Sequence, residues 1–437
     1  MAGAGAKLFN SGDVLTAAQV NTYLMDQTIM TFASTTARDA AFGGAGEPTL
    51  AEGMFAYTSD TNTLWLYTGS TDGWVNLLGS SIGQQALSNR NVIINGAMQV
   101  AQRGTSTASI TAGDFIYRTA DRYNTALSSL GTWTESVEND APTGSGLRKS
   151  LKFLCTTADA SPAAADYFIM SQSLEGQNVQ QFAKGTSAAK SFALSFWVKS
   201  NVTGTYTVNL RDLDNTRSCA ASYSISASAT WEKKTIIFPA DTTGAFDNDN
   251  AASLRLVFNL AIGSNYSSGT LQTTWGANVD ANLAVGQTNL ASAINNYWQV
   301  TGVQLEAGAV ATPFEFEPIS DTLTKCFRYF QRIINGADQT NEAVVTLQST
   351  GATAAYGFKG LFSPMRATPT ISSTAANTYS ARDTAGNGVT PTSLSFSVIS
   401  PRGFLFNLGA ASGLTAGAAV LVIANSATAT LDASAEL

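Results

Sequence analysis

The sequence predicts a mainly β protein, and three observations lead to this fold class. Segment after segment alternates apolar and polar residues with the period of two that is typical of strands. Gly, Ser, Asn and Asp, which favour turns, fill the gaps between these segments. Charged residues make up 13% of the 437 residues, about half the usual share of roughly 25%. This composition suits sheets with many turns and surfaces that are buried against copies of the same chain.

The first region, residues 1–50, contains the clearest helical pattern, at residues 13–30. Thr16 and Gln19 form a T-x-x-Q capping box, and apolar residues follow at helical spacing. We therefore predict an N-terminal helix. Because few apolar positions recur, it needs a packing partner. Two roles stay open: docking on another protein, or packing within its own subunit.

Residues 51–91 predict a small β-hairpin module followed by a linker. Two aromatic-rich strands, at 54–58 and 63–67, are joined by SDTN, and a third strand begins at Trp74. The polar, turn-rich stretch 79–91 predicts the linker. Three aromatic side chains of this module, Trp65, Tyr67 and Trp74, are a candidate platform for sugar stacking. Packing in the core or between subunits is the favoured interpretation for them.

Residues 92–319 predict a β-sandwich domain. Within SFALSFWVKS, alternation places Phe192, Leu194, Phe196 and Val198 on one face, towards the core, and Trp197 on the other. The strand-like segments are SLKFLCTT, SFALSFWVKS, TYTVNLRD, WEKKTIIFPA, ASLRLVFNLAIG and YWQVTGVQLE.

A boundary between two domains is predicted where an acidic, proline-containing stretch meets an aromatic and basic one, in residues 303–332. Pro313 and Pro318 restrict the backbone and remove two hydrogen-bond donors. Ser320 is expected to cap a short helix. Residues 320–437 then form a second β-rich block, predicted to be a sandwich-like domain.

The bulk composition argues against several classes of function. The net charge is −7 and no stretch concentrates Lys and Arg, so nucleic-acid binding is not expected. The longest apolar run near the end, residues 416–424, is about half the length of a membrane span, and no secretion signal is recognisable. We expect a soluble protein made in a cytosol. Its three cysteines are expected to be buried free thiols: Cys155, Cys219 and Cys326.

The absence of histidine removes the commonest general base, nucleophile-activating partner and metal ligand. The phosphate-binding, dinucleotide-binding and nucleophile-elbow motifs do not occur either. We therefore predict a protein that is not an enzyme, with no catalytic residues, no cofactor and no metal.

Several segments, taken in their order along the chain, resemble the carbohydrate-binding-like jelly roll of bacteriophage tail fibres and related virion appendages. They are NVIINGAMQVAQRGTS at 91–106, ADRYN at 120–124, DNDNAASLRLVFNLAIGSNYSSGTLQTTW at 247–275 and YWQVTGVQLEAGAVATPFEFEP at 297–318. TLTKCFRYFQR, FSPMRATPTI and the acidic LDASAEL are similar to the segments that lead into, and belong to, the distal modules of such fibres. The hairpin at 53–78 resembles a motif found near the N-termini of phage structural proteins.

This resemblance implies a trimeric virion fibre, synthesised in the host cytoplasm. The N-terminal region would attach to other virion proteins, and the central jelly roll and distal β-domain would contact host glycans. Two alternatives stay open: a tailspike-type polysaccharide depolymerase using a carboxylate pair such as Asp212 and Asp214, or a purely structural decoration of the head or collar.

For the glycan, the predicted binding residues are Tyr266 and Trp275, with Asp247 and Asp249 beside them, because sugars bind through aromatic faces and planar polar groups. Two other interpretations remain: a solvated loop with Trp275 at the edge of the core, or a Ca²⁺ site at Asp247, Asn248 and Asp249, which lacks the full spacing of a known calcium loop.

Overall fold

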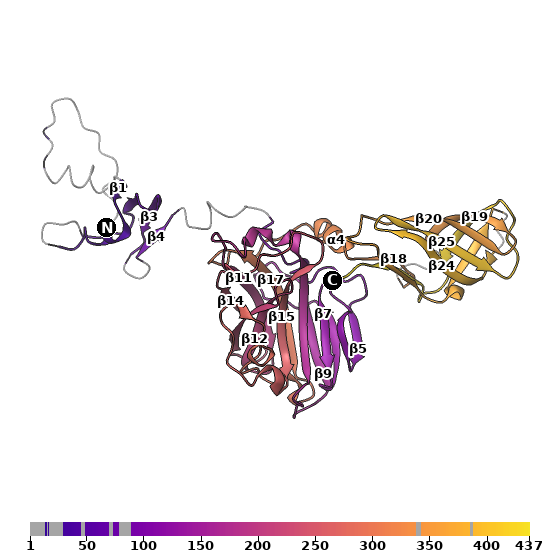
Figure 1. The fold of residues 1–437 in the computed structure, drawn as a ribbon, viewed down its shortest axis with the longest axis horizontal. Coiled ribbons are helices and arrows are strands. Elements are labelled where there is room, and N and C mark those ends of the chain that lie inside the picture. The colour runs from indigo at the N-terminus through magenta and orange to yellow at the C-terminus, as the bar shows by residue number, and fades with distance from the viewer. Residues whose placement is uncertain are drawn as a thin grey trace. The chain divides into compact units, whose positions relative to one another are not determined.

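The computed structural model describes residues 14, 16, 29–44, 49–69, 73–77, 89–337, 342–384 and 388–437. The chain divides into two compact units, residues 1–88 and 89–437, each rich in strands (Figure 1). The predicted mainly β fold is confirmed. The predicted N-terminal helix lies almost wholly outside the described residues, and its last two residues, Ile29 and Met30, belong to a strand instead.

The first unit contains a four-stranded sheet in the order β1-β2-β3-β4, with β1 parallel to β2. Its elements are β1 (Ile29–Phe32), α2 (Thr35–Asp39), β2 (Phe55–Thr58), β3 (Thr63–Tyr67) and β4 (Trp74–Asn76). The guanidinium of Arg38 lies 4.6 Å from the ring centre of Trp65 and 5.0 Å from that of Trp74. These tryptophans therefore pack around a buried arginine within the unit.

The second unit begins with a sandwich of two antiparallel sheets. The seven-stranded sheet, in the order β16-β13-β12-β15-β10-β7-β6, contains β6 (Gly113–Tyr117), β7 (Asn124–Ser128), β10 (Tyr167–Glu175), β12 (Gly204–Asp212), β13 (Arg217–Ile225), β15 (Ala252–Ile262) and β16 (Gly276–Ala277). The six-stranded sheet, in the order β14-β11-β17-β9-β8-β5, contains β5 (Ser106–Ile110), β8 (Thr132–Glu138), β9 (Ser150–Thr157), β11 (Phe192–Ser200), β14 (Glu232–Phe238) and β17 (Tyr297–Ala307). Short 3-10 helices lie at Gly176–Asn178, Gln180–Phe182, Ser264–Tyr266, Asp280–Asn282 and Leu290–Ser292.

Eight of these strands have the connectivity of a jelly roll. In chain order they are β9 to β15 and then β17. The first, eighth, third and sixth are neighbours in one sheet, β9-β17-β11-β14, and the second, seventh, fourth and fifth are neighbours in the other, β10-β15-β12-β13. This interleaving is the double Greek key of a jelly roll.

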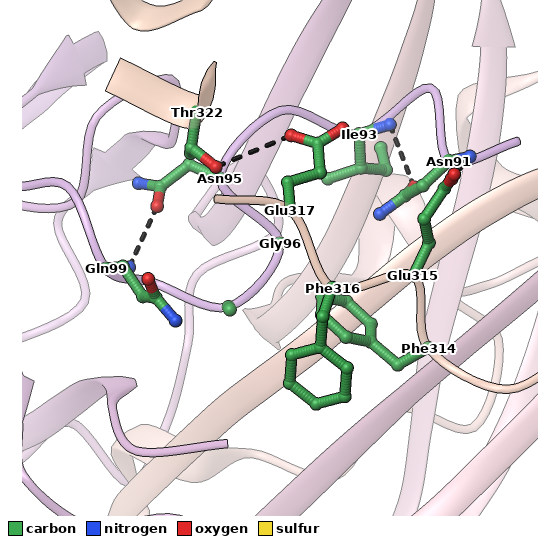
Figure 2. A pocket seen from close by; sticks show the side chains of 11 residues that line it. Asn91, Ile93, Asn95, Gly96, Gln99, Phe314, Glu315, Phe316, Glu317 and Thr322 are labelled. Atoms are coloured by element: carbon green, nitrogen blue, oxygen red, sulfur yellow. Dashed lines mark hydrogen bonds between the residues drawn. The ribbon is translucent and has the colours of Figure 1, made fainter. Parts of the chain in front are cut away.

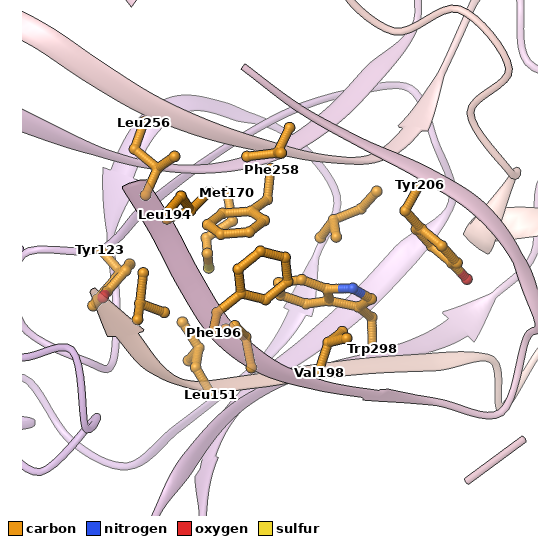
Figure 3. Packing of buried hydrophobic residues seen from close by; sticks show 14 of the residues in the cluster. Tyr123, Leu151, Met170, Leu194, Phe196, Val198, Tyr206, Leu256, Phe258 and Trp298 are labelled. Carbon is orange, nitrogen blue, oxygen red and sulfur yellow. The ribbon is translucent and has the colours of Figure 1, made fainter. Parts of the chain in front are cut away.

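The core between the two sheets contains the side chains that alternation predicted for β11. Phe192, Leu194, Phe196 and Val198 are all fully buried, whereas Trp197 lies on the opposite face and is part-exposed. Figure 3 shows Phe196 beside Phe258 and Trp298, from three different strands. The three cysteines are buried and unpaired, as predicted.

Residues after the jelly roll form α4 (Ile319–Phe327) and two further sheets with their own core. The three-stranded sheet β18-β27-β21 contains β18 (Phe330–Asn335), β21 (Thr370–Ser373) and β27 (Thr430–Ser434). The seven-stranded sheet β23-β22-β26-β19-β20-β25-β24 contains β19 (Ala343–Gly351), β20 (Ala354–Gly360), β22 (Tyr379–Asp383), β23 (Gly388–Val389), β24 (Pro391–Ser400), β25 (Gly403–Ala410) and β26 (Ala419–Ala424). A last 3-10 helix lies at Ala376–Thr378. No helix among the described residues is long and apolar enough to cross a membrane.

The helix at the domain boundary is present, but its predicted cap is wrong. Pro318 occupies the N-cap, and its carbonyl accepts hydrogen bonds from the backbone of Asp321 and Thr322. Ser320 lies within the first turn. Pro318 has a φ of −55° and no backbone N–H that would require an acceptor, so the helix can begin directly after it.

The charges of the boundary segment form ion pairs. Glu317 pairs with Lys325 across the start of α4. Arg328 makes two hydrogen bonds, of 2.7 and 2.6 Å, to the buried carboxylate of Glu175 at the end of β10. Although burial alone would raise the pKa of Glu175, Arg328 holds it below the usual value. The acidic and basic stretches thus fix the C-terminal domain against the jelly roll.

A second group of contacts at this boundary involves the last residues of the chain. The Glu436 carboxylate pairs with Arg122 and, at 3.1 Å, with Arg103. Arg366 donates to the carbonyl oxygens of Ala435 and Glu436 at 2.6 and 2.9 Å. We call this group, Arg103, Arg122, Arg366 and Glu436, the C-terminal clasp.

Candidate functional site

The four predicted binding residues do not come together. Asp247 and Asp249 precede β15, and Tyr266 follows it. The ten residue steps from Ala252 to Ile262 span roughly 33 Å at about 3.3 Å per residue. The two aspartates and the tyrosine therefore flank opposite ends of one long strand.

The segment 247–250 contacts the C-terminal domain. The Asn250 side-chain amide donates to the Arg366 carbonyl at 2.6 Å, and Arg366 Nη1 donates to the Asn250 carbonyl at 2.8 Å. The Asp249 carboxylate accepts the backbone N–H of Ala251. No cluster of three or more metal-ligating side chains occurs within the described part of the chain, so the Ca²⁺ alternative gains no support from the geometry.

Trp275 lies at the edge of the core, as one of the alternatives from the sequence proposed. Its ring centre is 5.4 Å from that of Phe192, and its indole N–H donates to the carbonyl of Pro239 at 2.8 Å. The ammonium of Lys184 lies 5.3 Å from the centre of the Trp275 ring. These contacts engage the indole in the fold. The other predicted residues stay accessible, with Asp247 and Asp249 exposed before β15 and Tyr266 part-exposed after it.

Lys184 explains the environment of Trp275 and also the role of Asp212. This lysine has no exposed side-chain surface and lies 2.6 Å from the Asp212 carboxylate and 3.1 Å from that of Asp241. Burial would raise the pKa of Asp241, but Arg217 and Lys184 hold it below its usual value. The Asp212 side chain is equally enclosed. Asp212 neutralises a buried lysine, so this member of the carboxylate pair considered for glycoside hydrolysis has a structural explanation.

The outer face of the seven-stranded sheet carries a constellation that sequence reasoning missed. Arg211 on β12 and Arg255 on β15 are direct cross-strand partners. Arg255 is in turn paired with Ser173 on β10. In the next row of the same face, Asn209 lies level with Val257, Ser171 and Asn124. We name this side of the sheet the arginine face; its residues are the half-buried Phe115, Arg211 and Arg255 and the buried Asn124, Ser171, Ser173 and Asn209.

Each arginine is held by a neutral neighbour. Arg211 Nε donates to Asn209 Oδ1 at 3.0 Å, and Arg255 Nε donates to Ser173 Oγ at 3.0 Å. Burial, and secondly the charge of Arg255, lower the pKa of Arg211; burial lowers the pKa of Arg255. Within the described residues, no carboxylate lies within ion-pair distance of either guanidinium.

Aromatic side chains border this face. The pairing of β6 with β7 is irregular between Gly113 and Ile116, and within this bulge Phe115 has a φ of +53°. Its ring lies 4.2 Å from the Arg255 guanidinium carbon. Positive φ is rare for a bulky residue, and bulges often redirect a side chain near a functional site. Farther along the face, Tyr167 and Tyr266 make an edge-to-face pair with centres 5.8 Å apart.

The pockets of the second unit do not provide a better site. The one in Figure 2 lies between Asn95 and Glu317 near the domain boundary, and its volume of about 20 Å³ is of the order of one water molecule. Larger hollows of about 490 and 580 Å³ lie beside Arg328 and in the loop 139–148. The hollow beside Arg328 is lined by Tyr329, Lys325 and Arg328, but each of these two cations already pairs with a carboxylate, that of Glu317 or of Glu175. The hollow in the loop 139–148 has no aromatic ring in its lining.

Comparisons with known proteins give structural likenesses only. No model of a protein family matches the chain, and no curated protein matches it. The enzymatically active domain of tailspike protein 4 from bacteriophage CBA120 is 14% identical with a TM-score of 0.27; the match covers 50% of this chain and 21% of that one. The carbohydrate-binding module TmCBM61, solved with β-1,4-galactotriose, is 9% identical with a TM-score of 0.25, covering 50% and 99%. A family 11 carbohydrate-binding module from Clostridium thermocellum is 12% identical with a TM-score of 0.24, covering 48% and 98%. No functional conclusion is drawn from likenesses of this size.

Proposed function

We propose that this chain is a bacteriophage fibre protein that binds a glycan on the host surface through the arginine face of its jelly roll. The observation that carries the proposal is the composition of that face. Guanidinium, carboxamide and hydroxyl groups lie in adjacent rows on four strands, bordered by Phe115 and Tyr266. Sugars are bound by such planar polar groups together with aromatic faces.

The fibre role is supported by the sequence resemblance and by the mechanics of the domain boundary. A fibre transmits force between domains in series, which favours a stiff connection over a flexible linker. Here the boundary has two prolines, the Glu175–Arg328 ion pair and the C-terminal clasp. In this proposal the N-terminal region attaches to other virion proteins, and residues 92–437 face the host.

Homotrimerisation follows from the same proposal. A single shallow sugar site binds weakly, because it buries little area. Three parallel copies raise the effective affinity by orders of magnitude when host glycans are dense. Low charge, together with side chains such as Phe358 and Tyr356 that are 65% and 47% exposed on β20, suits a chain whose surface is partly covered by its own copies.

The test is binding of the purified full chain to an array of bacterial surface polysaccharides. We expect saturable binding without release of reducing sugar. Phe115→Gly should weaken it, since glycine removes the ring while tolerating the positive φ. Phe316→Ala, which removes a phenylalanine that is 53% exposed outside the face, is the matched control.

Two results would reject parts of this proposal. Release of reducing sugar would favour the depolymerase alternative. A folded protein that binds no polysaccharide on the array and no host cell would favour a purely structural decoration.

A further inference from the structure

We propose that the ligand of the arginine face is an acidic glycan, whose carboxylate or sulfate group is bound jointly by Arg211 and Arg255. This inference rests on the proposed function and specifies the chemical class of its ligand. It starts from the direct cross-strand pairing of two arginines, which places their Cβ atoms roughly 5 Å apart on the same face.

Such a pair is unfavourable unless something compensates it. Like charges directly opposite each other destabilise a sheet. Both side chains are also half-buried, so solvent screens their repulsion incompletely. The two nearby groups that act on Arg211 to raise its pKa, Asp280 and Tyr266, form no ion pair with it. Elsewhere in the second unit, the buried Arg122 and the half-buried Arg328 each have a carboxylate partner. The pair on the arginine face thus lacks the counter-charge that the same fold supplies to other arginines.

An unused hydrogen-bond donor next to Arg211 gives a second, independent observation. Asn209 is fully buried; its Oδ1 accepts from Arg211, but its Nδ2 has no partner. Asn124, in the same row of the face, is 1% exposed; its Oδ1 accepts from Ser171, and its side chain also lies within hydrogen-bonding reach of Tyr117, so it offers no clear free donor. A buried donor without a partner is costly, so the Asn209 Nδ2 favours an added hydrogen-bond acceptor next to Arg211.

The geometry of the arginines suits an oxyanion. With each Nε used internally, the terminal nitrogens remain to bind the two oxygens of a carboxylate or two oxygens of a sulfate. Phe115, held in its positive-φ bulge, packs on Arg255 and fixes the guanidinium plane. Tyr167 and Tyr266 lie farther along the same face, where the uncharged part of the sugar can pack. A charged substituent and an apolar ring face are both accommodated on such a surface.

The test uses matched acidic and neutral oligosaccharides with the full-length protein. The probes are 3′-sialyllactose and lactose, tri-galacturonate and tri-galactose, and sulfated and unsulfated N-acetyllactosamine, measured by calorimetry or on an array at constant ionic strength. We expect the acidic member of at least one pair to bind roughly tenfold or more tightly than its neutral partner. The carboxylate and sulfate arms distinguish the two sources of the oxyanion.

Variants assign the effect to the arginines. Arg211→Gln and Arg255→Gln should each abolish the preference for the acidic probe. Arg255→Lys should keep only part of the preference for the acidic probe, because an ammonium cannot bind two oxygens side by side. Arg148→Gln, at an exposed arginine in the loop between β8 and β9, makes the same change in net charge and should have no effect. In the unliganded protein, Arg211→Gln should not lower the denaturation midpoint, since it removes a repulsion.

The outcomes separate this inference from the proposed function. Tight binding of neutral and acidic members alike, or an acidic preference that survives both glutamine variants, overturns the inference and leaves glycan binding standing. Binding of the neutral probes alone also overturns the inference and leaves glycan binding standing. If neither these probes nor the polysaccharide array is bound by folded protein, the inference and the proposed function both fail.

Discussion

Removing the charge of Glu436 should uncouple the C-terminal domain from the jelly roll. The side chain of Arg122 is 1% exposed and that of Glu436 is 9% exposed. Burial acts to lower the pKa of Arg122, but Glu436, together with weaker contributions from Tyr117 and Tyr329, holds the pKa above its usual value. The Glu436→Gln variant keeps the volume of the side chain, so no cavity forms, but it leaves the buried guanidinium without its counter-ion.

The magnitude follows from what Arg122 keeps. Breaking a buried ion pair by removing one partner costs about 3–5 kcal/mol. Arg122 still donates to the Ser173 carbonyl at 2.7 Å, and its guanidinium carbon still lies 3.5 Å from the centre of the Tyr329 ring. We therefore expect the lower end of the range, about 3 kcal/mol.

Urea denaturation followed by two signals measures this directly. All seven tryptophans lie before residue 299, so their fluorescence does not report on the C-terminal domain, whereas circular dichroism reports on all sheets. In the wild type we expect the transitions of the second unit to coincide; in Glu436→Gln the C-terminal domain should unfold first and the two signals should separate. Glu52→Gln, at an exposed glutamate of the first unit, is the control. Coincident transitions with a loss below about 0.5 kcal/mol would show that the clasp does not couple the domains.

Three further predictions concern stability and assembly. Burial raises the pKa of Asp121 to about 6 from 3.8, so the folded state retains a proton that the unfolded chain releases. Stability should fall by about 3 kcal/mol (roughly two pH units at 1.36 kcal/mol each) as the pH rises from about 4 to 6, and Asp121→Asn should lack this slope in urea titrations. Gly176→Ala should cost roughly 2 kcal/mol or more in the same assay, because its Cβ would lie 1.9 Å from the Asp247 carbonyl, whereas Gly351→Ala, with open space around it, should cost less than 1. Light scattering should give about three times the chain mass of 45.6 kDa, and a stable monomer at micromolar concentration would contradict the trimer.

The parts of this fold that local pattern determines could be read from the sequence. Alternation in β11 identified its core face, because the period of two depends only on the strand itself. The boundary helix was also visible, and only its cap was misplaced, since Pro318 can occupy the N-cap without a side-chain hydrogen bond.

The arginine face could not be read in the same way. Alternation along β15 places Arg255 on the face that Leu254 and Leu256 do not share, which indicates an outward-facing arginine. Its pairing with Arg211, however, depends on the strand order of the jelly roll and on register. Conversely, Asp249 and Tyr266 are close in sequence and were grouped together, although the long strand β15 separates them. Proximity along the chain is misleading wherever a full-length strand intervenes.

Ser173 contacts both the C-terminal clasp and the arginine face, and its substitution tests whether these two groups of residues act separately. Its carbonyl accepts from Arg122 of the C-terminal clasp, and its hydroxyl accepts from Arg255 of the arginine face. Ser173→Ala removes only the second contact. The clasp should therefore hold, and the two unfolding signals should stay coincident.

Binding should change instead. Without the hydroxyl, Arg255 loses the acceptor that fixes its Nε. A hydrogen bond made by a charged group contributes about 1.5–3 kcal/mol, and only the part of it that positions the guanidinium is lost from binding. We expect the dissociation constant for the preferred acidic probe to rise roughly three- to tenfold while that for its neutral partner stays constant. Ser253→Ala is the matched control, because that buried hydroxyl has no partner among the described residues. If Ser173→Ala left acidic binding unchanged, positioning of Arg255 by Ser173 would be refuted; if it separated the unfolding signals, the clasp and the face would be one coupled structure.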